Sequence, residues 1–172
     1  MSSDTTNSPE NTGSTENTDV QEFWHQLSKH HIVMLTDVFS GGLRARPMGA
    51  ITRIEEGLIW FMTDRDSAKV DEVEANPEVN LSIADAAANL YISITGHCSV
   101  VDDRSKIEEL WSPPHKAFFD GPDDSRIVLL RVTPDQGQMW SGPAGPIAAA
   151  KMMFAALTGN KPDLGTTTKV AL

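Results

Sequence analysis

The sequence contains one cysteine and no long apolar segment. Cys98 has no second cysteine with which to form an internal disulfide, and no Cys/His spacing typical of a structural zinc site occurs. No apolar run approaches the roughly 18 residues of a membrane-spanning helix. The N-terminus has neither the basic region nor the apolar stretch of a signal peptide. We therefore expect a cytoplasmic protein that binds no metal ion and does not enter a membrane.

Positive charge is also scarce. The 172 residues include 14 Lys and Arg against 24 Asp and Glu, which gives a formal net charge of -10. A surface of this sign repels the phosphate backbone of nucleic acids, so no nucleic-acid partner is expected. The length suits one domain with a single core.

The acidic residues are unevenly distributed. Residues 1–19 contain four of them, no Lys or Arg, and Met1 as the only large apolar side chain. Such a segment cannot bury enough apolar surface to offset the entropy lost on ordering. We therefore predict a disordered acidic leader over residues 1–19, a folded domain over 20–158 and a tail over 159–172.

The remaining pattern is typical of a mainly β protein. Short apolar, β-branched runs alternate with turn signals, and connections are short, which favours a small antiparallel barrel with peripheral helices over a parallel layout. We expect six or seven strands in meander order. Helices are predicted at 19–29, within 64–77 after a cap at Asp66 or Ser67, at about 103–111 and at 144–157. Strands are predicted at 32–39, 43–54, 58–63, 79–84 and 89–102. Residues 126–134 and 136–140 form either one last strand or a bent pair that breaks at Pro134, and the tail adds a short edge strand.

Two arginines near the start of one predicted strand form the first candidate anion site. Arg44 and Arg46 are two residues apart, so the alternation of a strand places them on one face. Two guanidinium groups on one face repel each other unless an anion or carboxylates lie between them. The alternative is a pair of surface arginines neutralised by Asp or Glu.

A strand end leading into a helix forms the second candidate. Thr63 ends the strand, and Ser67 and Lys69 follow where the helix begins. Amide N–H groups, a hydroxyl and an ammonium at a helix start suit a phosphate. The alternative is that Ser67 is only an N-cap and Lys69 a solvated side chain.

Two further features are less specific. Trp140 ends the last predicted strand and either closes the core or stacks on a flat heterocycle. The histidines lack metal-ligand spacing, so surface or core roles are expected for His25, His30, His31, His97 and His115.

The order of four segments identifies a family resemblance. LRARPM (43–48), WFMTDRDSAKVDEVEANPEVNLSI (60–83), YISITGHCSVVDD (91–103) and LLRVTPDQGQMW (129–140) together resemble the pyridoxamine 5'-phosphate oxidase-like FMN-binding split-barrel superfamily, and most closely its general stress protein 26 branch. The resemblance covers residues 20–158. It implies a six-stranded antiparallel split barrel that forms a homodimer, with FMN in two equivalent clefts at the interface.

The resemblance also implies a set of flavin-binding residues. One strand lies along the flavin, a second borders the ring and the ribityl chain, two residues bind the phosphate, and an aromatic approaches from the last strand. Trp111 and residues 117–121 match a loop near the cleft. FAD in place of FMN is left open. By this resemblance the strand along the flavin contains Arg44, Ala45, Arg46, Pro47 and Met48, and the strand that borders the ring and the ribityl chain contains Met62 and Thr63. The phosphate-binding residues are Ser67 and Lys69, and the aromatic is Trp140.

The sequence departs from the true pyridoxamine-phosphate oxidases. Gly49 replaces their lysine, Ser141–Ala144 replaces their Arg-x-His, and Ala68 stands where a second basic residue is common. We therefore expect an FMN-dependent oxidoreductase acting on another small substrate, with no catalytic residue assigned. A non-catalytic flavin carrier, sensor or interaction protein remains the alternative. Relatives that bind deazaflavin or haem leave a second cofactor open, and His97 is the one candidate haem ligand.

Overall fold

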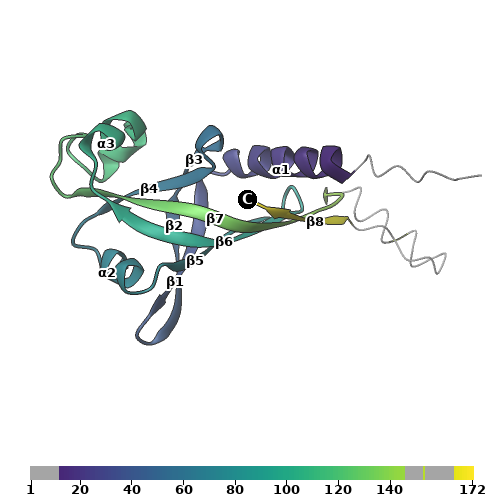
Figure 1. Cartoon of the computed structure of the whole chain (residues 1–172), viewed down its shortest axis with the longest axis horizontal. Helices are drawn as coiled ribbons and strands as arrows, with labels where there is room; N and C mark the ends of the chain where they lie inside the picture. Colours follow the sequence, from purple (N-terminus) through teal and green to yellow (C-terminus); the bar gives the residue numbers. More distant parts are fainter. Residues whose placement is uncertain (1–11, 146–152, 154–164) are drawn as a thin grey trace, which may run out of the picture.

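The computed structural model describes residues 12–145, 153 and 165–172 (Figure 1). Its elements follow the chain in the order α1 (Thr12–Ser28), β1 (Ile32–Phe39), β2 (Gly42–Gly49), β3 (Ile51–Arg53), η1 (Ile54–Glu56), β4 (Leu58–Asp64), α2 (Ala68–Ala75), β5 (Glu78–Asp85), β6 (Leu90–Val101), α3 (Arg104–Leu110), η2 (Pro113–Ala117), β7 (Ile127–Ser141) and β8 (Thr166–Ala171), where η marks a short 3₁₀-helix. None of the helices in the described part of the chain is long and apolar enough to cross a membrane.

The described strands form one antiparallel sheet, which confirms the predicted mainly β barrel with peripheral helices. The strand order is β2-β1-β5-β6-β7-β4-β3, and β8 pairs with the C-terminal half of β7. The predicted meander order is wrong. Turn signals specified the β1–β2 and β3–β4 hairpins, but the pairing of β4 with β7 joins segments far apart in the sequence, which local patterns do not encode.

The sheet curls so that its two outermost strands are consecutive in the chain. β2 and β3 correspond to the single strand expected over 43–54, and they are separated only by Ala50. The Ala50 amide donates to the His31 carbonyl at 2.8 Å, which turns the chain from one edge of the sheet to the other. The barrel is therefore joined covalently at this point and is split elsewhere between β2 and β4.

The last long strand, β7, is continuous through Pro134, which agrees with one of the two alternatives predicted for residues 126–140. β7 carries a bulge there, because Thr95 pairs with Gln136 while Gly96 pairs with Pro134. A side chain at position 96 would overlap the Thr133 and Pro134 backbone. Gly96 thus allows the close approach that keeps β7 in the sheet.

Two apolar cores lie on opposite sides of β4 and β7. The larger core fills the barrel with side chains from β1, β4, β5, β6 and β7, and Phe23 and Leu27 of α1 are completely buried in it. The ring of Phe23 occupies the space that a side chain at Gly137 would need. The smaller core lies under α3 and contains Trp60, Ile107 and Phe119.

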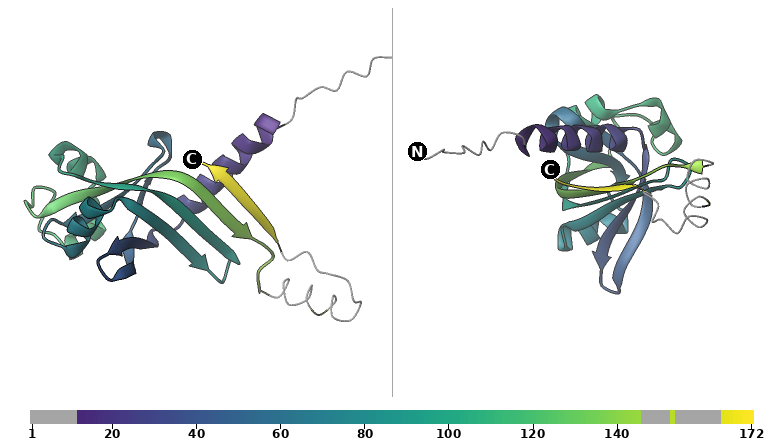
Figure 2. Two further views of the ribbon diagram at one scale, coloured as in Figure 1. Left: turned by 60° about the horizontal axis from the view of Figure 1, so that its bottom comes forward. Right: turned by 90° about the vertical axis from the view of Figure 1, so that its right-hand side faces the viewer.

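Helix α1 begins at Thr12, earlier than the predicted Asp19. Figure 2 shows its N-terminal turns continuing past the sheet, whereas its C-terminal turns pack against the barrel. Once the packed turns have nucleated a helix, each additional residue extends it at little cost, and no apolar pattern is needed. Residues 12–19 therefore do not belong to an irregular leader, and residues 1–11 lie outside the described part.

The tail contains the predicted edge strand, which is β8 on β7. The helix predicted at 144–157 falls mostly on residues outside the described ranges.

Candidate functional site

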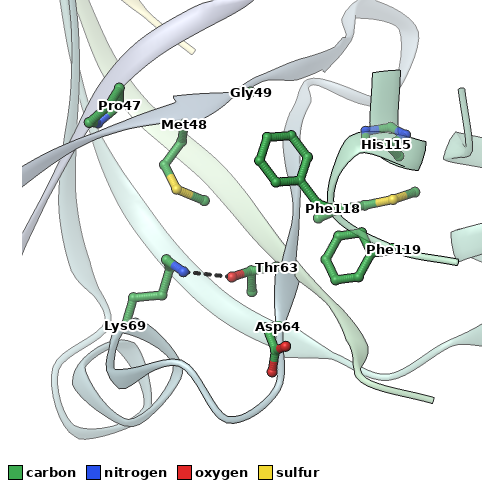
Figure 3. A pocket seen from close by; sticks show the side chains of 10 residues that line it. Pro47, Met48, Gly49, Thr63, Asp64, Lys69, His115, Phe118 and Phe119 are labelled. Atoms are coloured by element: carbon green, nitrogen blue, oxygen red, sulfur yellow. Dashed lines mark hydrogen bonds between the residues drawn. The ribbon is translucent and has the colours of Figure 1, made fainter. Parts of the chain in front are cut away.

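A cleft lies where the sheet fails to close. Strand β3 pairs with β4 only at Leu58–Trp60, and β2 pairs only with β1, so the described residues leave one edge of β2 facing the C-terminal end of β4. The cleft has a volume of about 400 Å³, which is within the range of cofactor sites. Figure 3 shows its lining, which is Pro47, Met48 and Gly49 of β2, Met62, Thr63 and Asp64 of β4, Lys69 of α2, and His115, Phe118 and Phe119 of the η2 segment.

Lys69 is the cation at one end of the cleft. Its Nζ donates to the Thr63 hydroxyl at 2.8 Å (Figure 3). Among the described residues, no carboxylate forms an ion pair with this ammonium. The carboxylate Oδ2 of Asp64 lies 3.6 Å from Nη1 of Arg126. Burial lowers the pKa of Lys69, and the nearby positive charge of Arg46 lowers it further. An anion beside Lys69 would reverse this effect, since an opposite charge favours the ammonium form.

Ser67 lies beside this cation at the start of α2. It occupies the N-cap position, but its hydroxyl does not cap the helix and instead lies 3.3 Å from the Thr63 hydroxyl. Three polar side chains, Thr63, Ser67 and Lys69, therefore meet next to the first amides of a helix, whose N–H groups have no partner within the helix. This arrangement matches the second predicted anion site and can bind a phosphate.

The rest of the lining is apolar or aromatic. Met48 and Met62 contribute thioether side chains from the two strand edges. Phe119 is buried in the smaller core, whereas Phe118 is 75% exposed at the mouth of the cleft. A cleft with a polar end and an apolar, aromatic remainder suits a ligand that has a phosphate at one end and a flat ring at the other.

His115 adds a polar group on the aromatic side. The Ser112 amide donates to His115 Nδ1 at 3.0 Å, so the neutral imidazole carries its proton on Nε2. Burial lowers the pKa of His115. The ring also lies 5.5 Å from that of Trp111, measured between centroids. The side chain is therefore fixed and favours its neutral form.

The two arginines of β2 share one face, as predicted, but carboxylates neutralise both. Arg46 Nη2 donates to Asp37 at 2.9 Å and to Glu72 at 2.6 Å, and Arg44 Nη1 donates to Glu72 at 3.0 Å. Neither arginine lines the cleft. This chain therefore shows the second alternative, in which Asp and Glu neutralise the arginines. Arg46 is largely buried, however, and does not lie at the surface.

Two other predicted residues lie outside the cleft of this chain. Trp140 is at the far end of β7, opposite Tyr91 of β6, and Ala45 faces outward from β2. The alternative haem ligand His97 is exposed and lies 2.9 Å from Asp135, away from the cleft. One chain therefore brings together Pro47, Met48, Met62, Thr63, Ser67 and Lys69.

Sequence reasoning missed His115 and Asp64 as cleft residues. The absence of metal-ligand spacing predicts only a surface or core role for His115 and says nothing of a cleft. The useful signal was its position between Trp111 and residues 117–121, the segment that the resemblance placed near the cleft. Phe118 and Phe119 of that segment do line it.

The chain belongs to the family described as pyridoxamine 5'-phosphate oxidase like, whose model matches residues 18–163. The matched segment contains strands β1 to β7 and every residue of the cleft lining.

Relatives with this fold include general stress proteins. General stress protein 26 of Bacillus subtilis is 26% identical over 113 residues, covering 63% of this chain and 79% of the relative. A crystal structure assigned to general stress protein 26 of Jannaschia sp. CCS1 has a TM-score of 0.74 and 28% identity, covering 91% of this chain and 99% of that one. The general stress FMN/FAD binding protein of Xanthomonas citri has a TM-score of 0.65 and 29% identity, covering 75% and 92%.

The half-buried environment of His115 predicts a pH effect on stability. Its pKa is lowered in the folded protein, so the unfolded chain binds more protons below about pH 6.5. The His115 contribution is complete above that pH and is lost as the pH falls towards the folded pKa. The His115→Asn variant should therefore lose less unfolding free energy than wild type between pH 7.5 and 5.5 in urea titrations. Equal losses in the two proteins would contradict this assignment.

Proposed function

We propose that the protein binds FMN in the cleft between β2 and β4. The observation that carries the proposal is Lys69, a cation at the polar end of an apolar cleft whose hydrogen-bond partner is a neutral hydroxyl. Lys69 and Ser67 would hold the phosphate, Thr63 and Met62 would border the ribityl chain and the ring, and the backbone of Pro47–Gly49 would lie along the ring. The match to the X. citri FMN/FAD binding protein supports the flavin.

We further propose that the protein is an oxidoreductase acting on a small substrate. Bound flavin would supply the electron-transfer chemistry, and the chain would bind, orient and shield it. His115, Phe118 and Phe119 form the side of the cleft that a substrate would contact. Gly49 and the Ser141–Ala144 segment remove the basic groups expected of a pyridoxamine-phosphate oxidase, so another substrate is proposed.

A homodimer is also proposed, on the outward face of the sheet. On this face, side chains of neighbouring strands form three rows that run across the sheet. The rows are Ala45, Thr36, Asn80, Thr95 and Gln136, then Pro47, Met34, Ser82, Ser93 and Gln138, and then Ile32, Ala84, Tyr91 and Trp140.

This uncharged face, as we call these three rows, has no Asp, Glu, Lys or Arg on β1, β2, β5, β6 and β7, although the chain carries a net charge of -10. At its border, Lys169 of β8 lies opposite Gln138. Ile32 is 63% exposed on it and Tyr91 is 40% exposed. Depletion of charge and enrichment in aromatic side chains are typical of the centre of a protein interface. Pro47 belongs both to this face and to the cleft lining, so a second copy on the face would also border the flavin. Trp140 would approach a flavin only across this interface.

The spectrum of the native protein tests the flavin proposal. Because the flavin would be held by Lys69 and by the strand edges, it should remain bound during purification. Gel filtration should give a particle of twice 18.7 kDa with flavin absorbance. Mass spectrometry of the ligand released on denaturation should identify FMN. A colourless protein whose addition leaves FMN fluorescence unchanged would exclude the proposal, and a Soret band would indicate haem instead.

Lys69 should account for recognition of the phosphate. Replacing it in Lys69→Met removes a hydrogen bond between charged groups, which typically contributes about 1.5–3 kcal/mol. The dissociation constant for FMN should rise roughly tenfold to hundredfold, while that for riboflavin should change little. Fluorescence titration of the flavin-free protein measures both constants. The Lys29→Met variant, at the exposed end of α1, is the matched control and should bind FMN like wild type.

Ser82 tests the proposed dimer. It lies in the middle row of the uncharged face, so Ser82→Arg places like charges at the centre of the interface, which is unfavourable. The variant should sediment as a monomer and bind FMN more weakly. Gln21→Arg adds the same charge at an exposed position of α1 and should leave the dimer intact. A dimeric Ser82→Arg protein would place the interface elsewhere.

A further inference from the structure

His115 is the polar side chain on the aromatic side of the cleft. It lies on the 3₁₀-helix η2 after Pro113 and Pro114, whose rings fix their own φ angles. The His115 carbonyl accepts hydrogen bonds from the amides of Phe118 and Phe119, at 2.9 and 3.0 Å. These bonds hold the histidine and the two phenylalanines in one short turn, and all three residues line the cleft (Figure 3). The aromatic side of the cleft is therefore ordered by its own backbone.

The imidazole of His115 is held at its Nδ1 edge. The amide and the hydroxyl of Ser112 both contact Nδ1, at 3.0 and 3.2 Å. Because the amide can only donate, Nδ1 is the acceptor, and the proton of the neutral imidazole is on Nε2. The ring of Trp111, which packs against the smaller core, lies beside the imidazole with 5.5 Å between the centroids. The imidazole therefore has a fixed orientation and a fixed tautomer.

Nε2 is the available donor of this side chain. It lies on the far edge of the ring and points away from Ser112. No residue in the described part of the chain forms a hydrogen bond with it, since both contacts of the ring are made by Nδ1. Nε2 is not among the buried polar atoms that lack a partner, so it is accessible from outside the protein. Its proton can therefore be donated to a molecule in the cleft.

We propose that Nε2–H of His115 is the donor that recognises the substrate of the oxidoreductase proposed above, and that this substrate is a small uncharged molecule with a flat ring and an accepting oxygen such as a carbonyl. The oxygen would accept the hydrogen bond from Nε2, and the ring would lie against Phe118 and Phe119. The inference rests on the proposed function and names the class of substrate that the proposed function left open.

The charges of the cleft favour an uncharged substrate. Lys69 and Asp64 are the charged residues of the described lining, and Lys69 lies at the end assigned to the flavin phosphate. Burial lowers the pKa of His115, so its imidazole is neutral near pH 7. Arg126 does not line the cleft and is paired with Asp124 and Asp64. An anionic substrate would therefore meet the Asp64 carboxylate without a free cation beside it, whereas a carbonyl compound would not be repelled.

The two phenylalanines suit the ring of such a substrate. Phe119 is buried, and the guanidinium of Arg126 lies 5.9 Å from the centre of its ring. Phe118 belongs to the same turn and is 75% exposed at the mouth of the cleft. Aromatic rings attract one another in offset-stacked and edge-to-face arrangements. A flat ring in the cleft would therefore also remove apolar surface of Phe118 from water.

Two probes of nearly the same shape isolate the contribution of the oxygen. Acetophenone has a carbonyl oxygen where α-methylstyrene has a methylene group, so only acetophenone can accept a hydrogen bond. Titration of the flavin-loaded protein, followed by flavin absorbance, gives both dissociation constants. The quantity compared between variants is the ratio of the α-methylstyrene constant to the acetophenone constant. This ratio cancels the contacts that the two probes share.

Two amide substitutions separate the two nitrogen atoms of His115. Asn places its amide near the position of Nδ1 and can keep the bond from Ser112, but it does not reach the position of Nε2. Gln is longer and places its NH₂ group near Nε2. We expect the ratio to fall about threefold to tenfold in His115→Asn, the range for a hydrogen bond between uncharged groups. His115→Gln should keep a ratio close to that of wild type.

A purely structural role predicts a different result. If His115 only held the segment through Ser112, Asn would be the better replacement, and neither variant would change the ratio. Lys116→Gln is the matched control, because Lys116 is exposed on the same segment and does not line the cleft. It should bind both probes like wild type. An unchanged ratio in His115→Asn would overturn the inference, and so would a wild-type protein that does not bind acetophenone.

Benzoate tests the charge of the substrate. It has the same ring as acetophenone and a negative charge, so the wild-type protein should bind it more weakly than acetophenone. Tighter binding of benzoate would overturn the assignment of an uncharged substrate.

Nitrogen NMR of the protein labelled with isotopic histidine gives a measurement that does not need the flavin. The signals of His115 are those missing from His115→Asn. Nε2 should carry the proton, and acetophenone should shift its resonance more than α-methylstyrene does. A proton on Nδ1, or equal shifts with both probes, would overturn the inference. A wild-type protein that does not bind FMN would refute the proposed function, and the nitrogen signals would still decide whether His115 binds the carbonyl oxygen.

Discussion

The site depends on one constraint, which is that the first and last strands of the sheet are consecutive in the chain. β2 and β3 are joined through Ala50, whose amide is held by the His31 carbonyl. A chain that turns directly from one sheet edge to the other cannot also pair those edges along their whole length. The unpaired part of β2 and the end of β4 must then face each other, and unpaired strand backbone needs other partners. The cleft is thus a consequence of how the barrel is connected, and it would not exist in a closed sheet.

Charge in this region is divided between structural and ligand-binding roles. Asp37 and Glu72 neutralise the two arginines that would otherwise repel each other, and Arg126, which pairs with Asp124 at 2.7 Å, also lies 3.6 Å from Asp64. Lys69 remains, with a threonine hydroxyl as its partner. A net charge of -10 is therefore compatible with binding one small anion, because the favourable potential is confined to a single residue at a helix start. Polyanions would meet the acidic remainder of the surface.

The sequence predicted what short-range patterns encode. The β1–β2 and β3–β4 hairpins, the helix at α3 and the strand end at Thr63 follow from local residue types. Sheet order was wrong because β4 meets β7 through contacts distant in sequence. The start of α1 was missed because residues 12–19 include no large apolar residue that could produce an apolar period. Arg46 pairs with Glu72, a residue 26 positions away whose approach only the packing of α2 reveals.

The two sides of the cleft are built from different kinds of structure. Strand edges and the start of α2 form the side with Lys69, and their geometry is fixed by the sheet and by the ion pairs beneath the helix. The other side comes from the η2 segment, where two prolines and the Ser112–His115 hydrogen bonds fix a short 3₁₀-helix. Such connecting segments can change without disturbing a scaffold. The side with Lys69 can therefore be kept while the residues of the η2 segment change. The loss of the basic residues at 49 and 141–144, together with a histidine at 115, is consistent with that division.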